Sequence, residues 1–370
     1  MQTPDKITFL NTRKDFTITL NKRVNNYFKQ NKISRFANRE MVIKTIVMMA
    51  LYFGPYALIL SGAISGTFIT IVMTILMGLG LAGIGLSVMH DGNHGAYAGK
   101  HWINSTIGYS LNLIGANSFN WKIQHNVLHH SYTNIYHADE DISVQRALRL
   151  SPNARWRWFH QYQAIYAWFL YGLMTLFWMF YKDFEQLWRY QKNGLLRKQK
   201  GDPAKEWAIL LTTKLIYVGY IFVAPILLTS WLWWQVLIGI VIMHFVTGFL
   251  LAIIFQPAHV IVGSEFPLPD KDRSMKDNWA IHQLRTTTNF ANSSRWFTWL
   301  VGGLNFQIEH HLFPGICHVH YRQISKVVKS TAREFGLPYK TVSTFSGALS
   351  GHLRLLRKLG MKRQGKLHIS

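Results

Sequence analysis

Seven of the 17 histidines fall into three short clusters. The clusters are His90-Asp91-Gly92-Asn93-His94, His125-Asn126-Val127-Leu128-His129-His130 and Gln307-Ile308-Glu309-His310-His311. Imidazole nitrogens are good ligands for iron, zinc and copper. Residues four apart share one face of an α-helix, so each of the first two clusters can present two rings to one point. Together the three clusters predict a polynuclear metal site.

The number of ligands indicates two metal ions. The first two clusters supply five imidazoles and the third adds two, while Gln307 occupies a place where a further histidine could stand. With His259 added, the set suits two ions. The Glu-x-x-His pairs of a carboxylate-bridged helical bundle are missing, and Cys317 is the only cysteine, so an all-nitrogen centre is predicted. Nitrogen ligation fits zinc as well as iron.

Two long uncharged runs must position these clusters. Thr45 to Met89 is 45 residues and Leu215 to Ser264 is 50 residues without Asp, Glu, Lys or Arg. A helix rises about 1.5 Å per residue and a hydrocarbon core is about 30 Å thick, so each run can cross a membrane twice. We expect the turns at Ser61–Gly66 and near Thr229–Trp231.

The charge distribution predicts the topology. The net charge is +23, with eleven Lys or Arg and one acid between Arg322 and Ser370. No nucleic-acid-binding module accompanies this charge, so it suits an anionic membrane leaflet or an acidic protein. The uncharged turns are therefore expected outside, and the basic segments in the cytoplasm.

A third apolar run, Trp158–Tyr181, complicates this topology. If it crossed the membrane, the seven Lys or Arg of Lys182–Lys205 would lie outside and the third cluster would lie opposite the first two. We therefore interpret it as an in-plane or shallow re-entrant helix, which its Trp and Tyr content suits. The predicted fold is all-α: four transmembrane helices in two hairpins, with a cytoplasmic helical cap holding a di-metal site.

We expect one domain over residues 1–370 and no signal peptide. Its predicted parts are a basic segment (1–44), a first hairpin (45–89), a cytoplasmic and interfacial region (90–206), a second hairpin (207–258) and a cap with a basic tail (259–370).

The three clusters resemble the histidine boxes of the membrane fatty acid desaturase family. The run Gln307-Ile308-Glu309-His310-His311-Leu312-Phe313-Pro314 resembles its front-end subgroup and bacterial acyl-CoA or acyl-lipid relatives. The resemblance extends from about Lys44 to Val342. It implies a non-haem enzyme that uses two iron ions, O2 and two electrons to place a cis double bond in an acyl chain.

The resemblance also implies the ligands. It carries over all seven box histidines, and it expects a further histidine at the cytoplasmic end of the fourth helix. His259 matches that place better than His244. Gln307 replaces a histidine of many members, and binding directly or through water both stay open. No catalytic side chain is predicted beyond the metal centre.

The expected partners are a fatty acyl substrate, membrane lipids and an electron donor. Front-end members with an N-terminal haem domain carry a His-Pro-Gly-Gly motif, but residues 1–44 contain no histidine. We therefore expect a separate donor, such as an acidic ferredoxin. The expected location is the bacterial cytoplasmic membrane, with both termini and the active site in the cytoplasm. The alternatives are a hydroxylase on the same centre and a non-enzymatic metal or lipid receptor.

Other polar residues near the boxes are open to two interpretations. Asp139, Glu140 and Asp141 fit a solvated turn as well as contacts to ligand histidines or to the substrate head group. Four further histidines are expected at the surface or the membrane interface: His101, His160, His352 and His368. Another four lie near the boxes and could orient ligand rings: His137, His282, His318 and His320.

Overall fold

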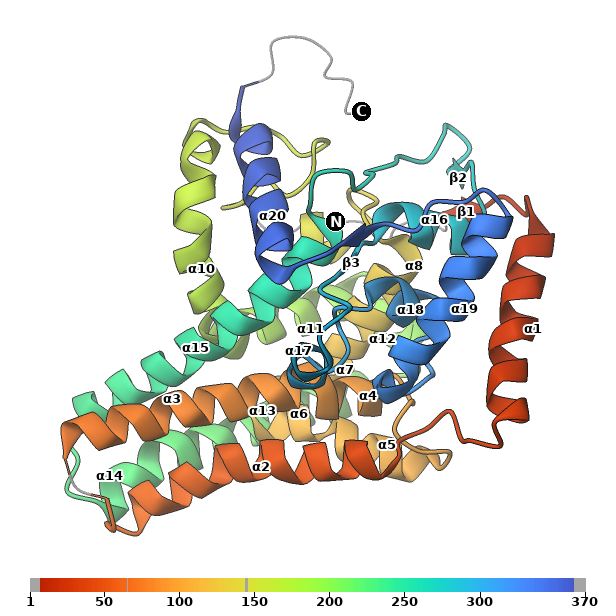
Figure 1. Cartoon of the computed structure of the whole chain (residues 1–370). Coiled ribbons are helices and arrows are strands. Elements are labelled where there is room, and N and C mark those ends of the chain that lie inside the picture. The colour runs from red at the N-terminus through yellow and green to blue at the C-terminus, as the bar shows by residue number, and fades with distance from the viewer. Residues whose placement is uncertain (1–6, 65, 144–145, 363–370) are drawn as a thin grey trace. The chain divides into compact units, whose positions relative to one another are not determined.

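The computed structural model describes residues 7–64, 66–143 and 146–362, and these are mostly helical (Figure 1). Outside the described residues lie residues 1–6 of the N-terminal basic segment, Ser65 of the first predicted turn, and residues 363–370 of the basic tail, which include His368. The chain divides into two compact units. Unit 1 holds residues Ala37–Lys122 and Phe169–Ala252, and the described part of unit 2 holds residues 7–36, 123–168 and 253–362.

Unit 1 is built from long apolar helices joined by short ones. They are α2 (Arg39–Leu60), α3 (Thr67–Gly83), α4 (Met89–Asn93), α5 (His101–Gly108), α6 (Ser110–Leu113), α7 (Ser118–Trp121), the end of α10 (Gln163–Phe177), α11 (Asp183–Lys192), α12 (Leu195–Lys198), α13 (Pro203–Val218), α14 (Ala224–Leu228) and most of α15 (Trp233–His259). Short π-helical segments interrupt them at Ile84–Val88, Trp178–Lys182 and Gly219–Val223.

Helices α2 and α3 form the first predicted hairpin and lie side by side (Figure 1). Their backbones approach closely at Gly80, where an added Cβ would lie 2.5 Å from the backbone nitrogen of Tyr52. The ends of α2 at Leu60 and of α14 at Leu228 confirm the two expected turns. The hairpins are therefore where the sequence predicts them.

Among the residues that the structure describes, five helical stretches are long and apolar enough to cross a membrane. They are Arg39–Leu60, Thr67–Asn93, Trp158–Lys192, Pro203–Leu228 and Trp233–His259. Four of them form the two predicted hairpins, and the fifth contains the Trp158–Tyr181 run. The number of crossings stays a prediction.

An ion pair is buried among the apolar helices of unit 1. Lys214 Nζ lies 2.7 Å from Asp183 Oδ2 and also donates to the carbonyl of Gly115 at 2.6 Å. Asp183 accepts from Trp178 Nε1 through its other carboxylate oxygen, and from Asn120 through its backbone carbonyl. A buried charge needs such partners because desolvation otherwise costs several kcal/mol. The pair thus fixes the loop at Gly115 and helix α7 to α11 and α13.

Unit 2 carries shorter helices and two strand pairs. Its helices are α1 (Lys14–Gln30), α8 (His130–Tyr132), α9 (Glu140–Ser143), the start of α10, the end of α15, α16 (Trp279–Thr286), α17 (Arg295–Leu300), α18 (Gln307–Leu312), α19 (Tyr321–Glu334) and α20 (Phe345–Gly360), with 3-10 turns at Trp158–Tyr162 and His318–His320. Strand β1 (Thr8–Phe9) pairs in parallel with β2 (Ser274–Met275), and β3 (Asn289–Phe290) pairs in parallel with β4 (Thr341–Val342). These ladders are short additions to a mainly α-helical chain.

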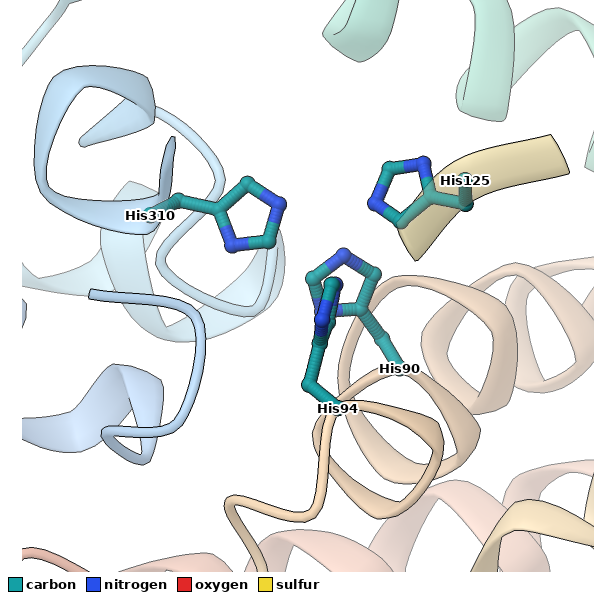
Figure 2. Close-up of side chains that lie close together, drawn as sticks. All are labelled: His90, His94, His125 and His310. Carbon is teal, nitrogen blue, oxygen red and sulfur yellow. The ribbon is translucent and has the colours of Figure 1, made fainter. Parts of the chain in front are cut away.

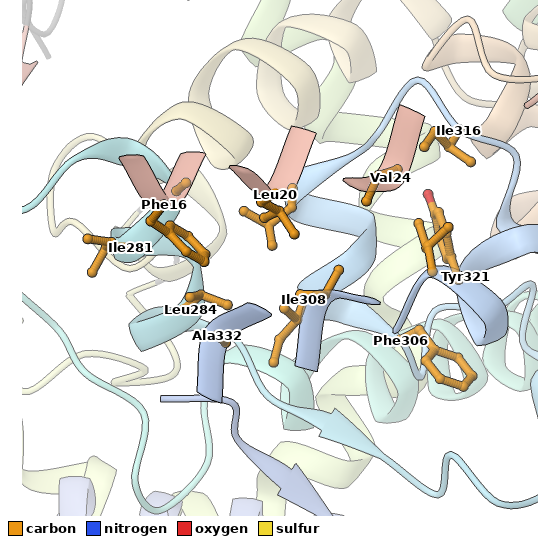
Figure 3. Packing of buried hydrophobic residues seen from close by; sticks show 14 residues of the cluster. Phe16, Leu20, Val24, Ile281, Leu284, Phe306, Ile308, Ile316, Tyr321 and Ala332 are labelled. Carbon is orange, nitrogen blue, oxygen red and sulfur yellow. The ribbon is translucent and has the colours of Figure 1, made fainter. Parts of the chain in front are cut away.

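The core of unit 2 joins α1 to the segment that carries the third histidine box. Helix α1 lies beside α19 (Figure 1). Figure 3 shows Phe16 and Leu20 of α1 packed into one cluster with Ile308, which lies two residues before His310. All three side chains are at most 2% exposed. Burial of a large apolar side chain stabilises by about 1.5–3 kcal/mol, so this cluster holds α18 firmly.

Candidate metal centre

The first box lies in unit 1, at the end of the second apolar helix. The π-helical turn Ile84–Val88 connects α3 to α4, which carries His90, and His94 caps the end of α4. Figure 2 shows the two rings one helical turn apart, and their centroids are 4.7 Å apart. The indole of Trp121 packs edge-on against both rings at 5.6 and 5.5 Å. The expected pairing of His90 with His94 is confirmed.

The second box lies in unit 2 on a π-helix rather than an α-helix. The π-helix spans Lys122–His129, and α8 continues directly from His130. A π-helix closes its hydrogen bonds one residue later than an α-helix, so residues four and five apart both lie near the starting residue. The ring of His125 therefore lies 5.3 Å from that of His129 and 4.7 Å from that of His130. The sequence predicted two rings at one point, and the π-helix brings three together.

The third box occupies α18, and all six of its residues are buried. Glu309 accepts hydrogen bonds from Asn289 Nδ2 and the Tyr339 hydroxyl, which occupy its two carboxylate oxygens. Burial raises the pKa of Glu309 to about 8, although both hydrogen bonds act to lower it. The carboxyl group thus anchors α18 to β3 and the segment before β4.

Two groups of three histidines meet in unit 2. In each, one nitrogen per ring lies within 4.8 Å of the others, and the groups are His129, His259 and His311, and His130, His310 and His311. Figure 2 shows His125 and His310, whose rings are stacked with centroids 5.7 Å apart. His259 is the last residue of α15, as expected. Unit 2 therefore gathers six of the eight predicted histidine ligands.

The nitrogen spacing is that of metal ligands. His130 Nε2 lies 3.2 Å from His125 Nε2 and 3.0 Å from His310 Nε2. A proton on His130 Nε2 can form a hydrogen bond to only one of these two nitrogens, so hydrogen bonding from His130 does not account for both contacts. Two nitrogens bound side by side at about 2.1 Å from one ion lie about 3.0 Å apart, so the spacing fits a shared cation.

Hydrogen bonds to the opposite nitrogen orient two of these rings. His129 Nδ1 lies 3.1 Å from both oxygens of Asp139 and 3.3 Å from Asp141 Oδ2. His259 Nδ1 lies 3.4 Å from the Thr286 carbonyl. Within the described residues, Nε2 of His129 and Nε2 of His259 are buried and have no hydrogen-bond partner. A buried acceptor without a partner is costly, and a bound metal ion would satisfy both nitrogens.

The carboxylates of Asp139 and Asp141 change the pKa of the His129 imidazole. Burial lowers the pKa of His129, but the negative charges of Asp139 and Asp141 outweigh this effect and raise the pKa to about 9. Asp139 is fully buried. Of the interpretations of this acidic segment, contact with a box histidine is therefore confirmed for Asp139 and Asp141.

Gln307 is fully buried at the start of α18. Its amide interacts with the His259 side chain, but neither Oε1 nor Nε2 makes a hydrogen bond of normal geometry in the described part of the chain. A buried amide in this condition fits a ligand or a water held by the centre, and its role stays a prediction.

The remaining histidines divide between surface and core. His101 and His137 are exposed. The prediction of a surface or interfacial place was wrong for His160 and His352, which are 2% and 0% exposed. Their rings bond to the backbone carbonyls of Arg146 and Val260, respectively. The partner of His352 lies 92 residues away and leaves no local signal in the sequence. His160 also accepts from the backbone N–H of Arg157, three residues earlier, as part of a helix cap.

Helix α16 makes hydrogen bonds to the second and third boxes and the chain after the second box, and His282 is the one residue of this helix that the sequence singled out. His282 Nε2 bonds to the backbone carbonyl of Thr133 at 2.8 Å rather than to a ring of the boxes, so its orienting role stays a prediction. Trp279 Nε1 donates to the carbonyl of His130 at 2.9 Å. Gln283 Oε1 lies 2.9 Å from Nδ1 of His311. No local pattern in the sequence marks Trp279 or Gln283 as a partner of the boxes.

The chain belongs to the fatty acid desaturase family, whose model matches residues 65–343. It is 35% identical over 363 residues to the sn-1 linoleoyl-lipid 6-desaturase of Synechocystis sp., covering 97% of this chain and 99% of that one. It is 34% identical over 373 residues to the desaturase of the same name from Arthrospira platensis, with 98% and 97% covered. The acyl-lipid (8-3)-desaturase of Physcomitrium patens is 38% identical over 349 residues, with 94% and 72% covered.

Replacement of His259 and of His244 should separate a ligand from a structural histidine. His259→Ala removes a ring that lies 4.7 Å from that of His129, so bound metal and turnover should both be lost. His244 Nε2 instead lies 2.8 Å from the Tyr217 hydroxyl, and its Nδ1 lies 3.1 Å from Thr175 Oγ1. His244→Ala should therefore retain its metal. Equal metal loss from both purified variants would contradict the assignment of His259.

Proposed function

We propose that this protein is an acyl desaturase that places a cis double bond in a fatty acyl chain at a di-iron centre. The observation that carries the proposal is the set of six buried histidines in unit 2, whose facing nitrogens are spaced as ligands of shared cations. Family membership supports iron over zinc. The overall reaction removes one hydrogen from each of two adjacent carbons and reduces O2 to two waters with two electrons and two protons.

We propose eight histidine ligands, with Gln307 as a further candidate. The eight are His90, His94, His125, His129, His130, His259, His310 and His311. His90 and His94 are included on the family pattern and on the ligand requirement of two ions. When bound, the iron pair supplies the oxidising power that an unactivated methylene needs.

The protein's own contribution is orientation and exclusion of water. Asp139 and the Thr286 carbonyl hold Nδ1 of His129 and His259, respectively, which directs Nε2 of each ring toward the ions. His310 forms a hydrogen bond with the Tyr321 hydroxyl at 3.3 Å. All of these side chains are at most 5% exposed, so they form a dry site in which side reactions with water are suppressed.

An apolar cavity in unit 1 is a candidate for part of the acyl-chain site. Its walls include Leu81, Gly85 and Met89, on the helical run that continues into His90, together with Leu111 and Leu251. Methylene groups gain about 0.8 kcal/mol each on burial, so such walls suit an acyl chain. The relatives named above are acyl-lipid desaturases, which favours a lipid-linked chain over acyl-CoA as the substrate.

A hydroxylase on the same centre is the alternative, because the ligands alone do not fix the fate of the oxidised carbon. The names of the relatives favour desaturation. A non-enzymatic receptor is less compatible with a complete set of histidines in the boxes.

Expression in a desaturase-deficient host tests the function. Fatty acid analysis of the host lipids should show a new cis double bond that is absent when His310→Ala is expressed to the same level. A hydroxylated product would establish the alternative, and an unchanged lipid profile in a host with an active electron donor would contradict both.

Elemental analysis tests the cofactor. Active purified protein should contain about two iron ions per chain, because eight nitrogen ligands exceed the requirement of one ion. One metal per chain, or zinc alone in active protein, would contradict the proposal.

We propose that a separate acidic electron donor, such as a ferredoxin, binds the basic cytoplasmic surface. Opposite charges accelerate such encounters at low ionic strength. The segment Lys182–Lys205 and helix α19 contribute many of the Lys and Arg residues.

The proposed topology has four crossings, with Trp158–Tyr181 not crossing. A reporter that works only in the cytoplasm should be active when fused after Lys200, and a reporter that works only outside should be inactive there. The reason is that seven Lys or Arg lie in Lys182–Lys205. Reporter activity only on the outer side would overturn the topology and the gathering of the three boxes at one centre.

A further inference from the structure

Helix α16 presents one face to the segments that carry ligand histidines in unit 2. Trp279 donates to the carbonyl of His130, and His282 bonds to the carbonyl of Thr133. Residues three and four apart share one face of a helix, so Gln283 lies on the same face as Trp279. This face contacts the chain from the second box as far as Thr133.

Gln283 has the most contacts to the metal site on that face. Its Oε1 lies 2.9 Å from Nδ1 of His311 and accepts from the Thr133 hydroxyl at 2.9 Å. Its Nε2 donates to the carbonyl of His130 at 3.1 Å. Gln283 is 0% exposed, so no solvent competes for these bonds. One side chain thus connects the second box to the third.

The hydrogen bond from Gln283 to the His130 carbonyl determines which ring nitrogen of His311 carries the proton. A carbonyl can only accept, so the amide NH2 of Gln283 must face His130 and the amide oxygen must face His311. An amide oxygen also only accepts, so His311 must carry its proton on Nδ1. The lone pair of His311 is then on Nε2, the nitrogen available for a metal.

We propose that Gln283 is a positioning residue that fixes His311 in the Nδ1-protonated form and so prepares it as a ligand. The inference rests on the proposed function. His311 belongs to both groups of three histidines, so its orientation affects the whole set. Removing a hydrogen-bond partner behind a metal-bound histidine typically weakens metal affinity about 10–100-fold.

Gln283→Leu tests the proposal, with Gln163→Leu as a matched control. Leucine is close to glutamine in size but cannot bond to His311. Gln163 is equally buried, and within the described ranges its amide bonds only to the backbone of Arg149 and Leu356. Competition with a chelator should show iron affinity about 10–100-fold weaker in Gln283→Leu and unchanged in Gln163→Leu. The Mössbauer spectrum of 57Fe-loaded protein should change only in Gln283→Leu.

Gln283→Glu provides a second test if Gln283→Leu does not fold. Burial favours the protonated carboxyl group, which retains an acceptor for His311 Nδ1 and a donor for the His130 carbonyl, so this variant should bind iron with an affinity close to that of the unsubstituted protein. Iron affinity in Gln283→Leu equal to that in Gln163→Leu would overturn the proposal, as would loss of iron from a folded Gln283→Glu. Absence of iron from the unsubstituted protein would instead contradict the proposed function.

Discussion

The close approach of buried imidazole nitrogens is the constraint on which unit 2 depends. His130 Nε2 lies within 3.2 Å of the same atom in His125 and His310, in a region closed to solvent. Lone pairs at such distances repel unless a proton or a cation lies between them. The surrounding structure therefore has to press these rings together, and the apolar cluster shared by α1, α18 and α19 provides the required packing (Figure 3).

The groups behind the rings are chemically different, so the three rings would be unequal as metal ligands. A carboxylate pair stands behind His129, a backbone carbonyl behind His259 and a neutral amide behind His311. A carboxylate partner makes an imidazole a stronger electron donor than a carbonyl or an amide does. The geometry thus assigns His129 the greatest electron donation among these three rings.

The sequence predicted the hairpins, their turns and the place of His259, because hydropathy and the spacing of breakers are local properties. It did not predict the π-helix at His125, since the register of backbone hydrogen bonds leaves no mark on the pattern of apolar residues. Nor did it predict the burial of His352, whose ring bonds to the carbonyl of Val260, 92 residues earlier. Trp279 and Gln283 on α16 were missed for the same reason: they lie about 150 residues beyond the second box and are joined to it only by folding.

The π-helical second box also limits how far this motif can be transferred between proteins. On an ordinary α-helix, His125 and His129 would share a face, but His130 would point more than a third of a turn away. A histidine pattern grafted onto a regular helical bundle would therefore lose one of its three rings. The three rings of the second box meet because Lys122–His129 forms a π-helix, a backbone conformation that is seldom stable by itself. An engineered site would have to reproduce that backbone before the choice of side chains could matter.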